Sequence, residues 1–198
     1  MTNVTHATSE ASRTHLSAAA AAVRDMLRQA DGARFSDPTP CADWDLGVLA
    51  QHFVGTTTGM AKIGRRQDLG ADPWAGPTVT ADDWSRVLDG NLAELVEAWN
   101  ADEAWAGTVT VGNEMPARVL GDMAYAETLL HGWDIARTLG AELVVSPAMA
   151  AVLLAGVEET AELGRQMEAY GPAVAVPEEA DDFQRALGVA GRDPHWTG

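Results

Sequence analysis

Long stretches with helical spacing of apolar residues cover most of this chain, and they limit its fold to an all-α one. Within each stretch the apolar residues recur every three or four positions, which places them on one face of a helix. The stretches run from about residue 9 to 30, 45 to 63, 80 to 99, 116 to 140 and 146 to 167. Helices of this length joined by short and medium loops predict an antiparallel four-helix bundle.

The ends of the predicted helices carry typical start and stop residues. Asp45 and Ser146 are suited to cap helix N-termini, and Pro116 is favoured in a first turn. Gly140 follows the fourth stretch, at a position where glycine often ends a helix. Thr80 and Asp83 have the spacing of a capping box at the start of the third stretch. These residues set the expected helix boundaries.

One segment breaks the helical pattern and favours a hairpin. Residues 105–113 alternate larger and smaller side chains and end in Gly112-Asn113, a pair typical of tight turns. A short hairpin or extended insertion is therefore expected before the fourth helix of the bundle. We expect the bundle to occupy residues 1–170, and residues 171–198 to form a C-terminal tail with one short helix that packs on the bundle.

The composition excludes several classes of partner and site. The chain has 198 residues and a formal net charge of −16, which argues against nucleic acids and anionic membrane surfaces. No apolar run approaches the roughly 20 residues of a membrane span, and the first residues do not resemble a secretory leader. A single cysteine, Cys41, excludes an internal disulfide and a cysteine-rich zinc site. We therefore expect a globular, cytoplasmic protein.

The fourth predicted helix places three polar side chains in a row on an otherwise apolar segment. Glu127, His131 and Asp134 are spaced by four and three residues, so they share one side of the helix. Burying a carboxylate is costly unless it is neutralised, paired or bound to a metal. Glu127 and His131 could simply hydrogen-bond each other, and for an isolated E-x-x-x-H motif this is the more frequent arrangement.

A second helix brings another imidazole to an inward face. His52 lies on the apolar stripe of the second predicted helix, where a polar residue needs a partner. Two imidazoles and a carboxylate are the protein ligands of a catalytic zinc, which keeps a position open for water or substrate. Nickel, iron or manganese could bind the same ligands. The spacing thus predicts a metal site of His52, Glu127 and His131, with hydrogen-bonded core residues as the alternative.

Other residues near this site have both structural and functional interpretations. Asp134 could orient a metal ligand, but an ordinary helical ion pair with Arg137 is the simpler prediction. Trp44 and Trp133 either pack in the core or line the pocket. Cys41 precedes the second helix, where a thiol can be activated. With no evident basic neighbour, we expect a small buried side chain instead. His195 could approach the site only if the tail folds back.

Three blocks of the sequence, taken together, resemble one known family. They are PTPCADWDLGVLAQHFVG, EMPARVLGDMAYAETLLHGWDIARTLG and GRDPHW, in this order along nearly the whole chain. The resemblance is to the DinB/YfiT-like metal-binding four-helix bundles, in the actinobacterial branch related to the N-terminal domain of mycothiol-dependent maleylpyruvate isomerase. It implies a divalent metal, usually zinc, held by His52, Glu127 and His131.

The resemblance also implies a function for the predicted metal site. In the characterised members, mycothiol binds the metal, which lowers the pKa of the thiol, so that it attacks a small electrophile as a metal-bound thiolate. We therefore expect a thiol S-transferase or isomerase, with Asp134 and Trp133 around the ligands. The alternatives are a non-catalytic metal- or small-molecule-binding stress protein and a hydrolase that uses metal-activated water. The expected partners are a small electrophile and a low-molecular-weight thiol, and the chain could form a homodimer.

Overall fold

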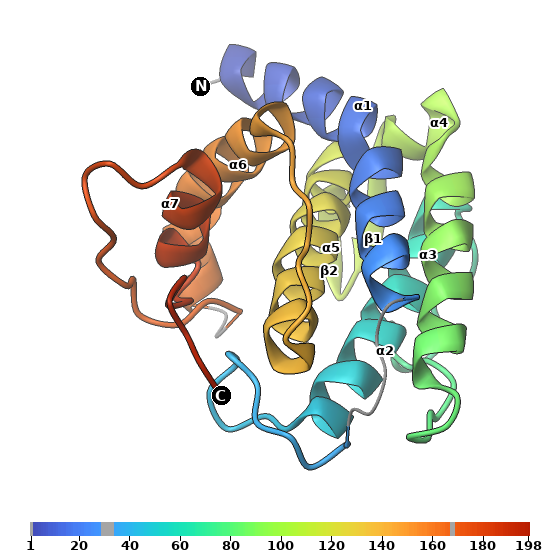
Figure 1. Ribbon diagram of the computed structural model, residues 1–198. Coiled ribbons are helices and arrows are strands. Elements are labelled where there is room, and N and C mark those ends of the chain that lie inside the picture. Colours follow the sequence, from blue (N-terminus) through green and yellow to red (C-terminus); the bar gives the residue numbers. More distant parts are fainter. Residues whose placement is uncertain (1, 29–33, 167–168) are drawn as a thin grey trace.

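The computed structural model describes residues 2–28, 34–166 and 169–198, with side chains from Ser9 onward (Figure 1). Its helices are α1 (Thr2–Leu27), α2 (Leu46–Gly64), α3 (Trp84–Trp99), α4 (Asp102–Trp105), α5 (Ala117–Leu139), α6 (Pro147–Gln166) and α7 (Asp182–Val189). Two strands, β1 (Thr108–Val111) and β2 (Asn113–Pro116), lie between α4 and α5. Among these described helices, none is long and apolar enough to cross a membrane.

Helices α1, α2, α3 and α5 form the predicted four-helix bundle. α2 packs against α3 and α5, and α1 packs against the same two helices. Large apolar side chains with almost no exposure fill the interior, among them Phe53, Leu88, Leu92, Trp99 and Tyr125. Burying each such side chain contributes about 1.5–3 kcal/mol to stability. The expected all-α fold class is therefore confirmed.

The predicted helix boundaries are confirmed where the chain has a capping residue. The carboxylate of Asp45 accepts a hydrogen bond of 2.9 Å from the backbone N–H of Val48, and α2 begins at the residue after Asp45. The hydroxyl of Ser146 accepts one of 3.3 Å from the N–H of Met149, and α6 begins directly after Ser146. Gly140 follows α5 with a φ of 64°, a conformation that costs little only for glycine.

The start of α1 differs from the prediction. The helix begins at Thr2, whereas the apolar spacing becomes visible only near residue 9. The first residues are mostly polar, so no apolar stripe marks this part of the helix. The predicted ends of α1 near residue 30 and of α6 near residue 167 lie outside the described residues.

The third helix also starts later than its capping-box spacing suggests. α3 begins at Trp84. Half of the capping box forms, since the carboxylate of Asp83 accepts a hydrogen bond from the N–H of Thr80, but the hydroxyl of Thr80 donates to the same carboxylate and does not accept from the N–H of Asp83. The residues between them therefore form a turn that precedes the helix. The four-residue helix α4 was not expected, since a single turn is too short to show a helical period.

The predicted hairpin is confirmed between α4 and α5. Strands β1 and β2 are antiparallel, with Val111 paired to Asn113 across the turn and Thr108 paired to Pro116 at the open end. Gly112 occupies the turn with a φ of 68°, where a side chain would be strained. β2 leads directly into α5, so the hairpin fixes where this helix begins.

Helices α6 and α7 pack on each other beside the bundle, at the left of Figure 1. After α7 the chain turns back toward the loop that precedes α2, where the C-terminus lies in Figure 1. The guanidinium of Arg137 on α5 donates to the backbone carbonyl of Trp196 and holds this returning segment. The division of the chain at residue 170 stays a prediction, since α6 and α7 pack across it.

Gly55 allows the loop at residues 73–76 to lie against α2. A Cβ atom at this position would overlap the backbone carbonyl oxygen of Trp74. We therefore expect Gly55→Ala to lower the free energy of unfolding by about 1–3 kcal/mol, as overpacking typically does, measured by urea denaturation. Gly90→Ala in α3 is the control. Its added Cβ meets nothing within 4 Å, so stability should rise by about 0.5–1 kcal/mol. Equal effects of the two changes would contradict this explanation.

Candidate metal centre

The structure brings His52, Glu127 and His131 together between α2 and α5. Glu127 Oε2 lies 3.2 Å from His131 Nε2 and 3.6 Å from His52 Nε2. Glu127 and His131 are one turn apart on α5, and His52 comes from α2, which packs against it. One donor atom from each residue lies within 4.8 Å of the other two. The three expected ligands thus converge, while metal binding itself stays a prediction.

The surroundings of Glu127 suit a cation. Its Oε2 atom is buried and has no hydrogen-bond partner in the part of the chain that the structure describes. Burial opposes the charge of this carboxylate, but the imidazoles of His131 and His52 outweigh burial and lower the pKa of Glu127. Ligand atoms about 2.0–2.1 Å from a tetrahedral ion are about 3.4 Å apart, close to the separations of 3.2 and 3.6 Å found here. The residues present therefore fit a divalent metal.

Asp134 connects His131 to the C-terminal segment. Its fully buried Oδ2 lies 3.0 Å from His131 Nδ1 and 3.1 Å from Arg192 Nη2. Burial opposes the charge of Asp134, but Arg192 and His131 lower its pKa to about 2. A carboxylate on one ring nitrogen fixes a histidine so that its other nitrogen can bind a metal. Asp134 therefore orients Nε2 of His131 toward Glu127.

The expected ion pair between Asp134 and Arg137 is wrong. Arg137 donates to the carbonyl of Trp196, and the partner of Asp134 is Arg192, which lies 58 positions further along the chain. Spacing within one helix cannot reveal such a partner. Arg192 belongs to the GRDPHW block. The sequence alone indicates a different residue of this block, His195, as the one that could approach the site. The tail does fold back, but His195 is exposed and Arg192 reaches the network.

Cys41 belongs to the same network, contrary to the expectation that it has no basic neighbour. Its thiol donates to Asp134 Oδ2 over 3.1 Å, with His131 and Arg192 close by. Burial raises the pKa of Cys41, so the protonated thiol is the donor. Cys41, His131 and Asp134 also offer three donor atoms within 4.8 Å of one another. Because Arg192 already balances the charge of Asp134, this group favours a hydrogen-bonded network over a second metal.

The two tryptophans near the expected ligands differ in position. The ring of Trp44 lies 4.8 Å from that of His52 and 6.2 Å from that of His131, centroid to centroid, and so walls the site. Trp133 is buried. Because residues two apart on a helix differ by about 200° in direction, its side chain leaves α5 on the side away from His131. Its place fits the core, and a role beside the ligands stays a prediction.

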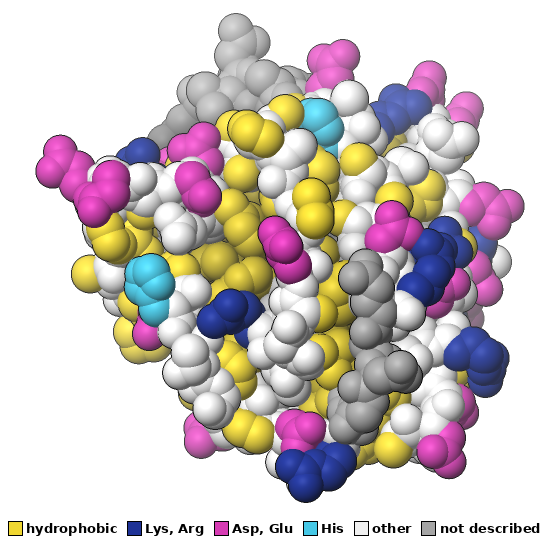
Figure 2. Space-filling model, in the orientation of Figure 1, with side chains coloured by type: hydrophobic (Ala, Val, Ile, Leu, Met, Phe, Trp, Pro, Cys, Tyr) yellow, Lys and Arg dark blue, Asp and Glu magenta, His cyan; other side chains and the backbone are white. Residues whose placement is uncertain are grey.

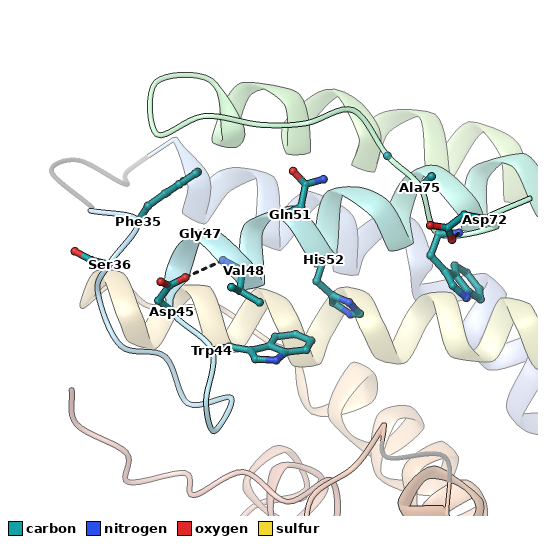
Figure 3. Close-up of a pocket in the computed structure, with 12 residues that line it drawn as sticks. Phe35, Ser36, Trp44, Asp45, Gly47, Val48, Gln51, His52, Asp72 and Ala75 are labelled. Carbon is teal, nitrogen blue, oxygen red and sulfur yellow. Dashed lines mark hydrogen bonds between the residues drawn. The ribbon is translucent and has the colours of Figure 1, made fainter.

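An open pocket of about 870 Å³ adjoins the three ligands through His52 (Figure 3). Figure 3 shows the rings of Trp44 and His52 next to each other, in front of α5. The pocket is lined by Phe35, Ser36, Trp44, Asp45, Gly47, Val48, Gln51, His52, Asp72, Trp74, Ala75 and Gly76. A small molecule in this pocket would lie beside one of the candidate metal ligands.

Known proteins are similar to this chain in sequence. The model of the mycothiol maleylpyruvate isomerase N-terminal domain matches residues 16–136, which include all three candidate ligands. Two uncharacterized proteins of Mycobacterium tuberculosis, from strains CDC 1551 / Oshkosh and ATCC 25618 / H37Rv, are each 28% identical to this chain over 119 residues. That match covers 60% of this chain and 62% of each relative, less than two thirds of their length.

Solved structures show the same fold. A crystal structure of mycothiol-dependent maleylpyruvate isomerase aligns with a TM-score of 0.59 and 17% identity, over 96% of this chain and 82% of that one. A histidine-to-alanine mutant of such an isomerase aligns with a TM-score of 0.54 and 17% identity, over 79% and 72%. The matched family model covers more than half of the chain. This protein, with its DinB-like bundle, therefore belongs to the family of mycothiol maleylpyruvate isomerase N-terminal domains.

Proposed function

We propose that this protein is a metal-dependent thiol S-transferase or isomerase, which acts on a small electrophile with a mycothiol-type thiol as cosubstrate. The observation that carries the proposal is the buried Glu127 Oε2. This atom faces Nε2 of His131 and of His52, with no hydrogen-bond partner among the residues described. Membership of the family supports the thiol, since the solved relatives are named as mycothiol-dependent isomerases.

His52, Glu127 and His131 would hold the metal, and zinc is the first choice because two nitrogens and one oxygen are typical ligands of a catalytic zinc. Nickel, iron and manganese are the alternatives. A bound metal would act as a Lewis acid that lowers the pKa of the thiol and raises its thiolate fraction at neutral pH.

The remaining side chains hold the ligands in place. Asp134 bonds Nδ1 of His131 and keeps Nε2 directed at Glu127. Arg192 balances the charge of Asp134, so Glu127 would be the ligand whose charge offsets that of a bound ion. Trp44 packs beside both imidazoles and shields one side of them from water. In this arrangement the bundle supplies the ligands, and the segment after residue 170 supplies the buried arginine.

Thiol consumption by the purified chain tests this proposal. Loaded with one equivalent of zinc, the protein should speed up the addition of a thiol to an activated alkene. Chelation should remove this activity, and added zinc should restore it. Glu127→Gln keeps the size of the side chain but removes its charge, so we expect it to lower zinc affinity at least roughly tenfold, along with the rate. His195→Ala is the control, because this side chain is exposed.

Two other outcomes would overturn the thiol chemistry. One bound equivalent of zinc without turnover of any thiol tested would identify a non-catalytic metal-binding protein. Hydrolysis of an ester or amide in the absence of thiol would identify a hydrolase that uses metal-activated water. Both would keep the metal assignment to His52, Glu127 and His131, whereas a protein that binds no metal would refute it.

A further inference from the structure

We infer that the pocket beside His52 takes an uncharged, flat and largely apolar molecule, such as an aromatic or conjugated electrophile, rather than a dicarboxylate. That this molecule is the substrate rests on the proposed function. The preference for uncharged molecules does not, because it follows from the lining of the pocket and can be tested without metal or thiol.

Aromatic and apolar surface dominates the accessible part of the lining. Phe35, Trp44 and Trp74 contribute rings to the pocket. Trp74 is 39% exposed and Val48 is 48% exposed. Among the described residues only four large hydrophobic side chains are exposed. Two of these four line this one pocket, so exposed apolar surface is concentrated there. Exposed apolar surface concentrated in a concave site is typical of small-molecule binding.

The charge of the lining is negative. Asp45 and Asp72 bring two carboxylates to the pocket, and no lysine or arginine is among the described residues that line it. The whole chain has a formal net charge of −16, and Figure 2 shows acidic side chains spread over the visible face. An approaching anion would meet repulsion from both sources. The lining therefore disfavours a molecule with two carboxylates.

Three arginines outside the lining are already engaged within the protein. Arg65 pairs with Glu94 at 3.1 Å and with Glu97 at 3.3 Å. Arg66 donates to backbone carbonyls around the hairpin and α4. Arg192 is the arginine of the network around His131, and it already faces the carboxylate of Asp134. Each of these guanidinium groups has its partner within the protein.

Three polar side chains of the pocket are also engaged. The amide of Gln51 donates to the carbonyl of Pro77 and accepts from the N–H of Val79, both at 3.1 Å. Asp45 and Asp72 each accept a hydrogen bond from a backbone N–H. A ligand rich in hydroxyl or carboxylate groups would lose its hydration here and find few free partners. Ring faces, in contrast, remain available for an apolar ligand.

The side of the pocket that carries Trp74 is fixed to the bundle. Added Cβ atoms at Gly55 and Gly59 would overlap the backbone oxygens of Trp74 and Pro73, so these glycines let the loop lie directly on α2. Trp74 therefore faces the pocket from a supported position, and its ring is an anchor for a flat ligand.

Cinnamyl alcohol and cinnamate test this inference, because they share a ring and a double bond and differ in charge. Each is titrated into the metal-free chain at low ionic strength, while NMR follows the indole Nε1–H signals. Cinnamyl alcohol should shift the signals of Trp44 and Trp74 and leave that of Trp84, which is buried in α3, unchanged. We expect it to bind about tenfold more tightly than cinnamate, given two carboxylates near the ligand.

Asp72→Asn provides the matched variant. Its side-chain oxygen can still accept from the N–H of Trp74, but the charge is gone. Cinnamate should then bind roughly threefold more tightly, while cinnamyl alcohol is unaffected. Equal binding of the two probes by the unmodified chain, or shifts that avoid Trp44 and Trp74, would overturn the inference. Since no metal or thiol is present, failure here is distinct from failure of the proposed function.

Discussion

Replacing His131 with alanine is expected to abolish the binding of one equivalent of zinc at neutral pH. His131 Nε2 lies 3.2 Å from Glu127 Oε2 and is one of only two imidazole nitrogens that face this carboxylate among the described residues. Losing a partner of a metal ligand costs roughly 10–100-fold in affinity, and losing the ligand itself should cost more. Elemental analysis after dialysis measures the bound zinc, and competition with a chelator gives the affinity.

His195→Ala serves as the control, because it removes an exposed imidazole and should keep the full equivalent of zinc. Since His131 is buried and bonded to Asp134, circular dichroism must first show that His131→Ala is folded. If it is not, Glu127→Gln tests the same centre with a smaller change. A folded His131→Ala protein that retains one equivalent of zinc would refute the ligand assignment.

Most of the fold could be predicted because local signals determine it. The apolar stripe of α2 and the cap at Asp45 lie within a few residues of each other, so a helix there needs no information from the rest of the chain. The same holds for Gly140 at the end of α5. Prediction was poorest where local signals are weak or compete, as at α3, where the hydroxyl of Thr80 donates to Asp83, so only half of the expected capping box forms and the first residues are a turn.

The three candidate ligands could be selected for a related reason. A polar side chain on an apolar helical face must find a partner inside the protein, and His52 and Glu127 both lie on such faces. In a small bundle, two polar side chains that face inward from different helices have few possible partners apart from each other. The pattern of buried positions along each helix is therefore enough to predict which polar side chains meet inside the bundle.

The surroundings of the ligands could not be predicted in this way. Arg192 reaches Asp134 only because α7 packs on α6 and the chain then returns to the loop before α2. Trp44 and Trp74, which wall the pocket, come from loops, whose paths leave no periodic trace in a sequence. Long-range contacts of this kind depend on how elements pack, not on the spacing within any one of them.

Replacing Arg192 with methionine is expected to lower both the stability of the protein and its affinity for zinc. Methionine keeps an unbranched apolar chain like the stem of arginine but has no charge, so the fully buried carboxylate of Asp134 would lose its cationic partner. Breaking a buried ion pair from one side typically costs about 3–5 kcal/mol in the free energy of unfolding. Because Asp134 also orients His131, we expect zinc affinity to fall roughly 10–100-fold. Urea denaturation of the metal-free chain and zinc titration measure the two effects.

Two further variants separate a lost charge partner from a lost contact. Arg192→Lys keeps a positive charge and should recover part of the stability. Its single ammonium group cannot reproduce the paired approach of Nε and Nη2 to Asp134. Arg185→Met is the matched control on α7, where this side chain is exposed, and should change stability by no more than about 0.5 kcal/mol.

A double variant decides whether Arg192 acts through Asp134. Asp134→Asn removes the buried charge, so adding Arg192→Met should then cost less than it does alone, by about 0.5–3 kcal/mol of coupling. Strictly additive losses would mean that Arg192 only fills space. In that case the folded fraction of Arg192→Met would also keep its zinc affinity. A side chain that only fills space does not affect the orientation of the His131 ring. Loss of affinity together with coupling would mean that the C-terminal segment takes part in forming the metal centre.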